Sequence, residues 1–176
     1  HANAKELGVD ASRLAVGGGS AGGGLAAGLA LLARDRGEVP LVFQLLIAPM
    51  LDDRTVTLDP PHSYTGEFIW LRESNRFGWT ALLNQEPGSE GISPYAAAAR
   101  AENLAQLPPA FIAVGALDLF VEEDMAYAQR LIRAGVPTEL HVYPGVYHGF
   151  QIVPNARVTQ AAARDQINAI RRALKW

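Results

Sequence analysis

The stretch that decides the fold is residues 13–37, which read Arg-Leu-Ala-Val, then Gly-Gly-Gly-Ser-Ala-Gly-Gly-Gly, then an Ala- and Leu-rich run closing on Arg-Asp-Arg-Gly. The partly apolar run 13–16 ends in glycines and predicts a β-strand. Leu25 to Arg36 predicts a helix, which the glycine at position 37 ends. Because this helix is apolar on nearly all sides, we expect it to be well buried. The unit is therefore strand, glycine-rich turn and helix.

The glycine-rich turn matches two functional motifs at once. Gly17, Gly19 and Gly22 have the spacing of the dinucleotide-binding fingerprint, Gly-x-Gly-x-x-Gly. Gly18, Ser20 and Gly22 have the spacing of the nucleophile elbow, Gly-x-Ser-x-Gly. Both motifs require a strand before and a helix after, so the context does not separate them. An ordinary glycine-rich turn is a third interpretation.

The dinucleotide interpretation makes a further demand that this chain meets poorly. It requires an acidic residue about 20 positions downstream, at the end of the next strand, to bind the ribose. Glu38 precedes the next apolar run, and Asp52 and Asp53 lie beyond Pro49. A phosphate-binding P-loop would require Gly-Lys-Ser or Gly-Lys-Thr, and the turn has no lysine.

The nucleophile-elbow interpretation makes a steric demand that the turn meets. A serine hydroxyl that projects above a sheet requires a strained turn, so the residues two before and two after it must be small. Gly18 and Gly22 satisfy this requirement around Ser20. Ala21 would then offer a backbone N–H at the helix start, where the helix dipole favours an anion.

The rest of the chain alternates between strand-like and helix-like segments. This order is typical of an α/β fold with a parallel sheet and right-handed crossovers. Residues 51–108 break the alternation, and we interpret them as an excursion above the sheet, with Phe68, Leu71, Trp79 and Leu82 at roughly helical spacing. The other expected elements are strands 41–48, 111–114 and 138–143, helices 119–134 and 157–174, and the end of a helix at 2–7.

Composition and charge exclude several classes of protein. The 176 residues carry a net charge of −3 without a basic stripe, so nucleic-acid binding is not expected. The chain has no cysteine and its four histidines are scattered, so we expect neither a metal nor a cofactor. The longest apolar run, Leu25 to Ala33, is too short to span a membrane. No signal-peptide pattern follows His1, so we expect a cytoplasmic protein.

A serine nucleophile requires a base and an orienting acid, which follow it in the order acid, then histidine. His148 lies on a turn after the last expected strand, where such a base belongs. Asp118 lies just after strand 111–114. Its position is equally compatible with two roles, the N-cap of the next helix and the catalytic acid. We interpret the acidic residues just after it, Glu122, Glu123 and Asp124, as surface charges that match the helix dipole.

These motifs together resemble those of a known family, the hormone-sensitive-lipase-like branch of the α/β-hydrolases. The chain is most similar to bacterial carboxylesterases of that branch, including the heroin-esterase type. The resemblance covers essentially the whole chain and keeps the motifs in the family's order. They are Gly-Gly-Ser-Ala-Gly-Gly at 18–23, Ile92–Tyr95, Leu107–Ala110, Asp118 before an acidic helix start, Ala134–Val136 and His148–Phe150.

The resemblance implies a carboxylic ester hydrolase that acts through an acyl-enzyme on short- to medium-chain substrates. It assigns Ser20 as nucleophile, Asp118 as acid, His148 as base and the N–H of Ala21 to the oxyanion hole. Residues 62–90 resemble part of the family's helical cap. Phe68 and Trp70 are then expected to face the acyl pocket, and strand 138–143 is a candidate edge for a homodimer.

The sequence departs from the family pattern at three places. Gly19 stands where the family usually has an acidic residue before the serine, and Leu119 stands where it usually has proline after the acid. The family's His-Gly-Gly-Gly oxyanion loop, which precedes the serine, is absent. We therefore expect residues 1–176 to be the carboxyl-terminal part of a single hydrolase domain without its N-terminal strands, and poorly active by itself.

Three alternatives to an esterase stay open on the sequence. A small-molecule-binding protein could use the same fold without catalysis. A Rossmann-type oxidoreductase would bind a nicotinamide nucleotide at the glycine-rich turn. An amidase or a thioesterase would use the same three catalytic residues.

Overall fold

The computed structural model describes residues 1–175 and contains, in that range, one parallel sheet with helices on both faces. Short 3-10 turns lie at Asp53–Thr57, Ala98–Arg100 and Phe150–Ile152. The main elements follow one another as β1 (Ala15–Gly19), α1 (Ala21–Arg36), β2 (Phe43–Ile47), α2 (Arg72–Leu83), β3 (Ala110–Gly115), α3 (Val121–Arg133), β4 (Thr138–Tyr143) and α4 (Arg157–Leu174).

The sheet has the order β1-β2-β3-β4, and each neighbouring pair is parallel. Gln44 of β2 lies opposite Ala110 of β3, which in turn lies opposite Thr138 of β4. The expected α/β fold with a parallel sheet is confirmed. Strand β4 forms one edge, as the expected dimer strand would, and its pairing with a second copy stays a prediction.

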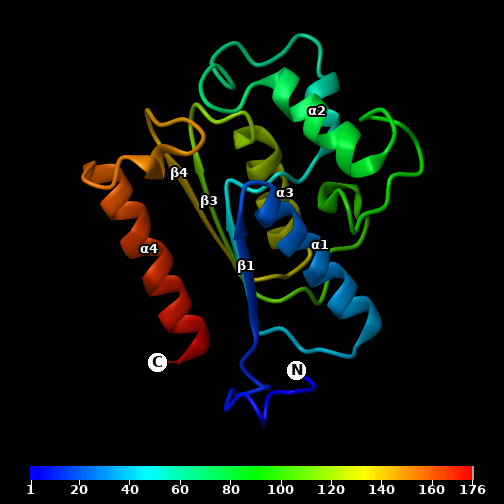
Figure 1. The fold of residues 1–176 in the computed structure, drawn as a ribbon, viewed down its shortest axis with the longest axis vertical. Coiled ribbons are helices and arrows are strands. Elements are labelled where there is room, and N and C mark those ends of the chain that lie inside the picture. Colours follow the sequence, from blue (N-terminus) through cyan, green and yellow to red (C-terminus); the bar gives the residue numbers. More distant parts are fainter. Residues whose placement is uncertain (176) are drawn as a thin grey trace.

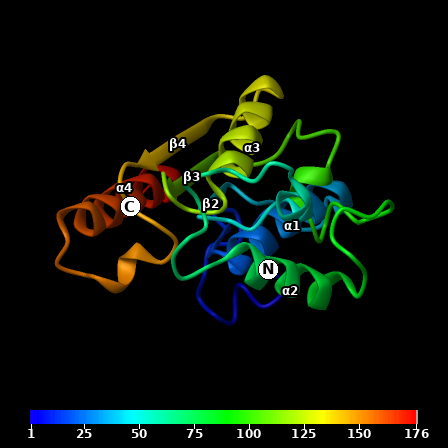
Figure 2. The same cartoon turned by 90° about the horizontal axis from the view of Figure 1, so that it is seen from above.

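Helices α1 and α3 pack on one face of the sheet and α4 on the other (Figures 1 and 2). The first face is filled by a cluster around Leu31, Leu46 and Ile112, and the second by one around Phe43 and Phe111. Both faces of the strands are therefore covered, which explains why β3 is apolar throughout, and β2 apolar except for Gln44, rather than alternately apolar and polar.

Helix α1 corrects one expectation about burial. The sequence predicts a helix buried on nearly all sides, but Leu25 and Leu29 are 57% and 50% exposed, so one side of α1 faces solvent. It instead turns its small residues inward, and a Cβ on Gly24 or Gly28 would lie 2.0 Å or 2.2 Å from a backbone oxygen. Only glycine permits so close an approach, so Leu25 and Leu29 lie on the outer face, whereas Leu31, further along the helix, is buried in the core.

Two boundaries at the start of the chain also differ from expectation. Strand β1 begins at Ala15 and continues through the glycines to Gly19, rather than ending at Val16. Residues 2–7 form turns and not the end of a helix. Hydrogen bonding to β2 determines how far β1 extends, and a glycine-rich sequence gives no sign of it.

The excursion between β2 and β3 lies over the carboxyl ends of the strands, with α2 above them (Figure 1). Trp79 anchors it in a cluster of its own with Val56, Ile92 and Phe120. The buried carboxylate of Asp53 accepts two hydrogen bonds from Arg100, each 2.8 Å long. That residues 62–90 form a cap unit stays a prediction. No helix within residues 1–175 has both the length and the apolar character needed to cross a bilayer.

Candidate active site

Ser20 occupies the sharp turn between β1 and α1. Its backbone has φ 55° and ψ −125°, a strained conformation for a residue with a side chain. The Ser20 N–H donates to the carbonyl of Ile47 over 2.8 Å, which fixes the turn to β2. A Cβ on Gly18 would lie 2.2 Å from the carbonyl oxygen of Gly22, so position 18 must be glycine. A Cβ on Gly22 would meet nothing within 4 Å, so the steric demand expected there is absent among the described residues.

Three side chains that are far apart in the sequence form one hydrogen-bonded chain. Ser20 Oγ lies 2.9 Å from Nε2 of His148, and Nδ1 of His148 lies 2.8 Å from Oδ2 of Asp118. The histidine and aspartate side chains are 11% and 1% exposed. Because both ring nitrogens of the imidazole are engaged, its orientation is fixed between the hydroxyl and the carboxylate.

Asp118 uses its two carboxylate oxygens for two different bonds. While Oδ2 faces His148, Oδ1 accepts the N–H of Phe120 over 3.0 Å. Phe120 is the N-cap residue of α3, so Asp118 lies two residues before the cap rather than at it. A helix-start role and an imidazole-orienting role are thus compatible in one residue, because separate oxygens serve them.

The expectation for two acidic residues of α3 is wrong. Glu123 and Asp124 are buried, at 7% and 0% exposure, and only Glu122 is on the surface. Burial raises the pKa of Glu123 to about 8, against the opposing effect of hydrogen bonds from Thr55, Leu51 and Asp52. Burial raises the pKa of Asp124 well above its ordinary value, and the nearby carboxyl groups of Glu123 and Asp118 raise it further. Within the described residues, neither oxygen of the Asp124 carboxyl accepts a hydrogen bond.

A small apolar pocket of about 160 Å³ lies beside the start of α1. Trp70 lines it, with its ring centroid 6.3 Å from that of His148. Phe68 does not line this pocket; it is 52% exposed, and its ring packs against that of Tyr147 in a tilted arrangement. The other residues that line the pocket are Ala21, Gly24, Leu25, Met50, Gly78, Trp79, Leu82 and Ala96.

Two residues near the imidazole were not recognised in the sequence. Phe120 packs edge-on against His148, with ring centroids 5.3 Å apart. Its place two residues after Asp118 is the only sequence signal for it. Gln166 of α4 lines a hollow of about 340 Å³ together with Ser20 and His148. No motif links Gln166 to either residue in the sequence, so the sequence could not indicate that it lies near them.

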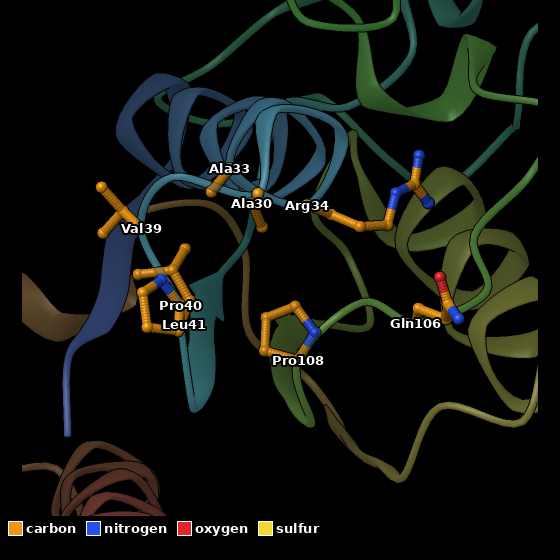
Figure 3. Close-up of a pocket in the computed structure, with 9 residues that line it drawn as sticks. Ala30, Ala33, Arg34, Val39, Pro40, Leu41, Gln106 and Pro108 are labelled. Carbon is orange, nitrogen blue, oxygen red and sulfur yellow. The ribbon is translucent and has the colours of Figure 1, made fainter. Parts of the chain in front are cut away.

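Another hollow, of about 310 Å³, lies at the opposite end of the sheet (Figure 3). It is bordered by Ala30 and Ala33 of α1 and by Pro40, Leu41 and Pro108, which precede β2 and β3. The strands are parallel, so this amino end is remote from Ser20 at the carboxyl end of β1.

The structure also bears on the alternative uses of the glycine-rich turn. Asp52 and Asp53, the candidate ribose ligands, are bonded to Arg54 and Arg100 respectively. They are therefore occupied by guanidinium groups instead of being free at the turn. Within residues 1–175, no group of three or more His, Asp or Glu side chains is arranged to hold a metal ion.

The chain is similar in sequence and in fold to known esterases. A family model described as the alpha/beta hydrolase fold matches residues 1–152. Carboxylesterase NlhH of Mycobacterium tuberculosis is 37% identical over 98% of this chain and 54% of its own length. Esterase LipI of the same organism is 36% identical over 93% of this chain and 51% of its own. The chain spans about half the length of the curated relatives it matches.

Solved structures agree with the sequence relatives. A structure described as a bacterial heroin esterase superposes with a TM-score of 0.92 at 43% identity, covering 99% of this chain and 56% of that one. Esterase LipW of Mycobacterium marinum superposes with a TM-score of 0.85 at 40% identity, covering 98% of this chain and 53% of that one.

Proposed function

Because this chain belongs to the α/β-hydrolase family, in its hormone-sensitive-lipase-like branch, we propose that it carries the catalytic residues of a carboxylic ester hydrolase. Ser20 is the nucleophile, His148 the general base and Asp118 the orienting acid. The observation that supports this most strongly is the continuous chain of hydrogen bonds from Ser20 Oγ through the imidazole to the Asp118 carboxylate.

The proposed reaction has two halves with one proton shuttle. His148 Nε2 takes the proton of Ser20 Oγ as the oxygen attacks the ester carbonyl, and it then gives that proton to the departing alcohol. In the second half, His148 takes a proton from a water molecule as its oxygen attacks the acyl-enzyme carbonyl. The bond from the acyl carbon to Ser20 Oγ then breaks, His148 returns the proton to Ser20 Oγ, and the acid is released. Asp118 accepts the Nδ1–H throughout, which holds the tautomer whose Nε2 is free to take a proton.

The N–H of Ala21 is the oxyanion donor we assign within residues 1–175. Ala21 is the first residue of α1, so its N–H has no acceptor one turn earlier in the helix and contributes to the positive end of the helix dipole, where an anion is stabilised. Loss of a single oxyanion donor typically costs about 2.7–4 kcal/mol of transition-state stabilisation. The activity of the whole protein therefore depends on how many donors act together with Ala21.

The apolar pocket beside Ala21 supports a short to medium acyl chain as the substrate's acid part. Trp70, Met50 and Leu82 line it and offer no charged group to bind a polar substituent. An acyl chain bound there extends from the carbonyl carbon at Ser20 towards α2. The esterase names of the relatives favour an oxygen ester over an amide or a thioester.

A substitution at the nucleophile tests the proposal. In the protein expressed from its complete reading frame, Ser20→Ala removes the attacking oxygen, so turnover of a short-chain nitrophenyl ester should fall by roughly 10⁴-fold or more. Turnover at the wild-type rate would reject the assignment. Nicotinamide nucleotide binding, measured by fluorescence titration of the same protein, would favour the oxidoreductase instead.

A further inference from the structure

The segment after β2, residues 48–52, is hydrogen-bonded both to the turn that carries Ser20 and to helix α3. The N–H of Met50 donates to the carbonyl of Ser20 over 3.0 Å, on one side. On the other side, the N–H of Leu51 donates to Oε1 of Glu123 over 2.6 Å. Neighbouring backbone groups of one short segment therefore join the nucleophile turn to α3.

Glu123 is the anchor of this segment on the α3 side. Its Oε1 also accepts the N–H of Asp52 over 3.1 Å, and its Oε2 accepts the hydroxyl of Thr55. The side chain is buried, and a carboxyl group in that environment is costly unless donors surround it. Two of the three donors belong to the segment 48–52 and the third, Thr55, follows it by three residues, so Glu123 is bonded to this segment and to the turn directly after it.

The contacts between the segment and α1 leave no room for it to shift independently. A Cβ on Gly24 would lie 2.0 Å from the carbonyl oxygen of Met50, and one on Gly23 would lie 2.8 Å from Pro49. The segment therefore touches the helix that follows Ser20 at backbone distance. A displacement of the segment would move the Ser20 turn with it, because packed interiors transmit strain.

Asp118, the proposed catalytic acid, is hydrogen-bonded to the same helix, α3. Asp118 Oδ1 accepts the N–H of Phe120, the N-cap residue of α3, and Glu123 lies in the first turn of that helix. Ser20 and Asp118 are thus held to one another through two routes. One is the imidazole of His148, and the other is the segment 48–52 anchored on Glu123.

We propose that Glu123 is a positioning residue that sets the distance and orientation between Ser20 and the Asp118–His148 pair by holding residues 51 and 52 on α3. This rests on the proposed function, since it concerns the same three catalytic residues. Glu123 itself touches no reacting atom. Its effect is geometric, and small displacements of catalytic groups cost up to about 10²-fold in rate.

We expect the hydrogen-bond acceptor Oε1 of Glu123, and not the charge of its carboxylate, to hold residues 51 and 52 on α3. Glu123→Gln keeps an oxygen for the N–H groups of Leu51 and Asp52, and its amide can donate to Thr55 Oγ. Glu123→Ala leaves two backbone N–H groups without an acceptor, which costs about 1–3 kcal/mol for each buried group. Glu123→Asp keeps the charge but withdraws the oxygens by one methylene.

The test is ester turnover per active site, counted by titration with a fluorophosphonate that reacts with the nucleophilic serine. Glu123→Ala should lower kcat per titrated site about tenfold or more with KM within about twofold, because the acyl pocket is unchanged. Glu123→Asp should lower it about threefold or more, and Glu123→Gln should restore it to within about threefold. The matched control Glu122→Ala, at the exposed neighbour, should match the wild type.

Each other outcome has a distinct meaning. Wild-type kcat per titrated site in both Glu123→Ala and Glu123→Asp overturns the positioning role, since a purely structural residue lowers only the number of competent sites. Glu123→Gln as poor as Glu123→Ala overturns the acceptor argument. If Glu123→Ala does not fold, Glu123→Asp alone decides. A wild-type protein without ester turnover would instead refute the proposed function.

Discussion

The two ends of the sheet are built on different principles. At the amino end, prolines precede β2, β3 and β4, and the hollow of Figure 3 is bordered mainly by Ala, Val, Leu and Pro. At the carboxyl end, two non-glycine residues, Ser20 and Ala48, adopt positive φ, and buried carboxyl groups accept backbone N–H groups. A non-glycine residue with positive φ occurs at the amino end too, because Gln106 beside that hollow has a φ of 63°. The two ends therefore differ in their buried carboxyl groups that accept backbone N–H groups, which lie at the carboxyl end, around the proposed site.

The largest expected difference between the two ends is the cost of adding one methyl group. Gly24→Ala puts a Cβ 2.0 Å from the Met50 carbonyl oxygen, so α1 must move, and we expect a loss of about 3 kcal/mol or more in the free energy of unfolding. Gly37→Ala at the amino end meets nothing within 4 Å and has only its φ of 64° to accommodate, for about 1 kcal/mol. Urea unfolding of both variants measures the two losses in the free energy of unfolding. Equal losses would contradict the expected difference between the two ends of the sheet.

The next largest effect concerns acyl-chain selectivity. A Cβ on Gly78 would lie 3.5 Å from Trp70 and 3.8 Å from Met50, so Gly78→Leu fits its first carbon and fills the apolar pocket with the rest. We expect kcat/KM for a hexanoate ester to fall about tenfold while that for an acetate ester stays within about threefold.

The matched control is a substitution that enlarges a side chain in the hollow at the amino end of the sheet. Ala33→Leu enlarges a side chain in the amino-end hollow, so it should change neither ester's kcat/KM. Equal losses for acetate and hexanoate in Gly78→Leu would show that the pocket does not receive the acyl chain.

The smallest expected effect is a change in pH dependence. Unfolded aspartate ionises near pH 4, whereas burial raises the pKa of Asp124 in the folded protein. The folded state therefore binds the extra proton, so this contribution to stability is full below about pH 4 and is lost as pH rises towards the folded pKa.

Asp124→Asn removes that titration. As the pH rises from about 5 to about 8, the free energy of unfolding should decrease in the wild type, and it should decrease by at least about 1 kcal/mol less in the variant. Urea unfolding at each pH measures both decreases. Glu122→Gln, on the exposed side of the same turn, should leave the wild-type slope unchanged. An identical slope in Asp124→Asn would mean that the carboxyl is not protonated in the fold.

The sequence was sufficient where local chemistry decides the structure. Strand β4 and helix α4 have the predicted bounds, since alternation and glycine or proline turns mark them. The position of His148 after the last strand predicts that it lies at the same sheet edge as Ser20, because the carboxyl ends of parallel strands share one edge. Asp118 was equally compatible with a helix cap, and only the family resemblance assigned it as the acid; the three side chains form one hydrogen-bonded chain.

The sequence was insufficient where distant segments decide burial. An acidic first turn has the same pattern whether it faces water or another backbone, so the pattern could not reveal that residues 51–55 cover Glu123. Likewise, α1 is apolar all round, and only the close approach of its glycines to the Met50 and Tyr95 carbonyl oxygens turns Leu25 and Leu29 outward. Phe68 and Trp70 were equivalent in the sequence, and the fold brings only Trp70 to the pocket.

The central claim is that Ser20 Oγ forms the covalent bond to the acyl group. Mass spectrometry of peptides after reaction with a fluorophosphonate tests it most directly. We expect a single adduct, on the peptide that contains Ser20, and a strong reduction of that adduct when His148 is replaced by alanine. An adduct on any other residue, or an undiminished adduct in the His148→Ala variant, would contradict the claim.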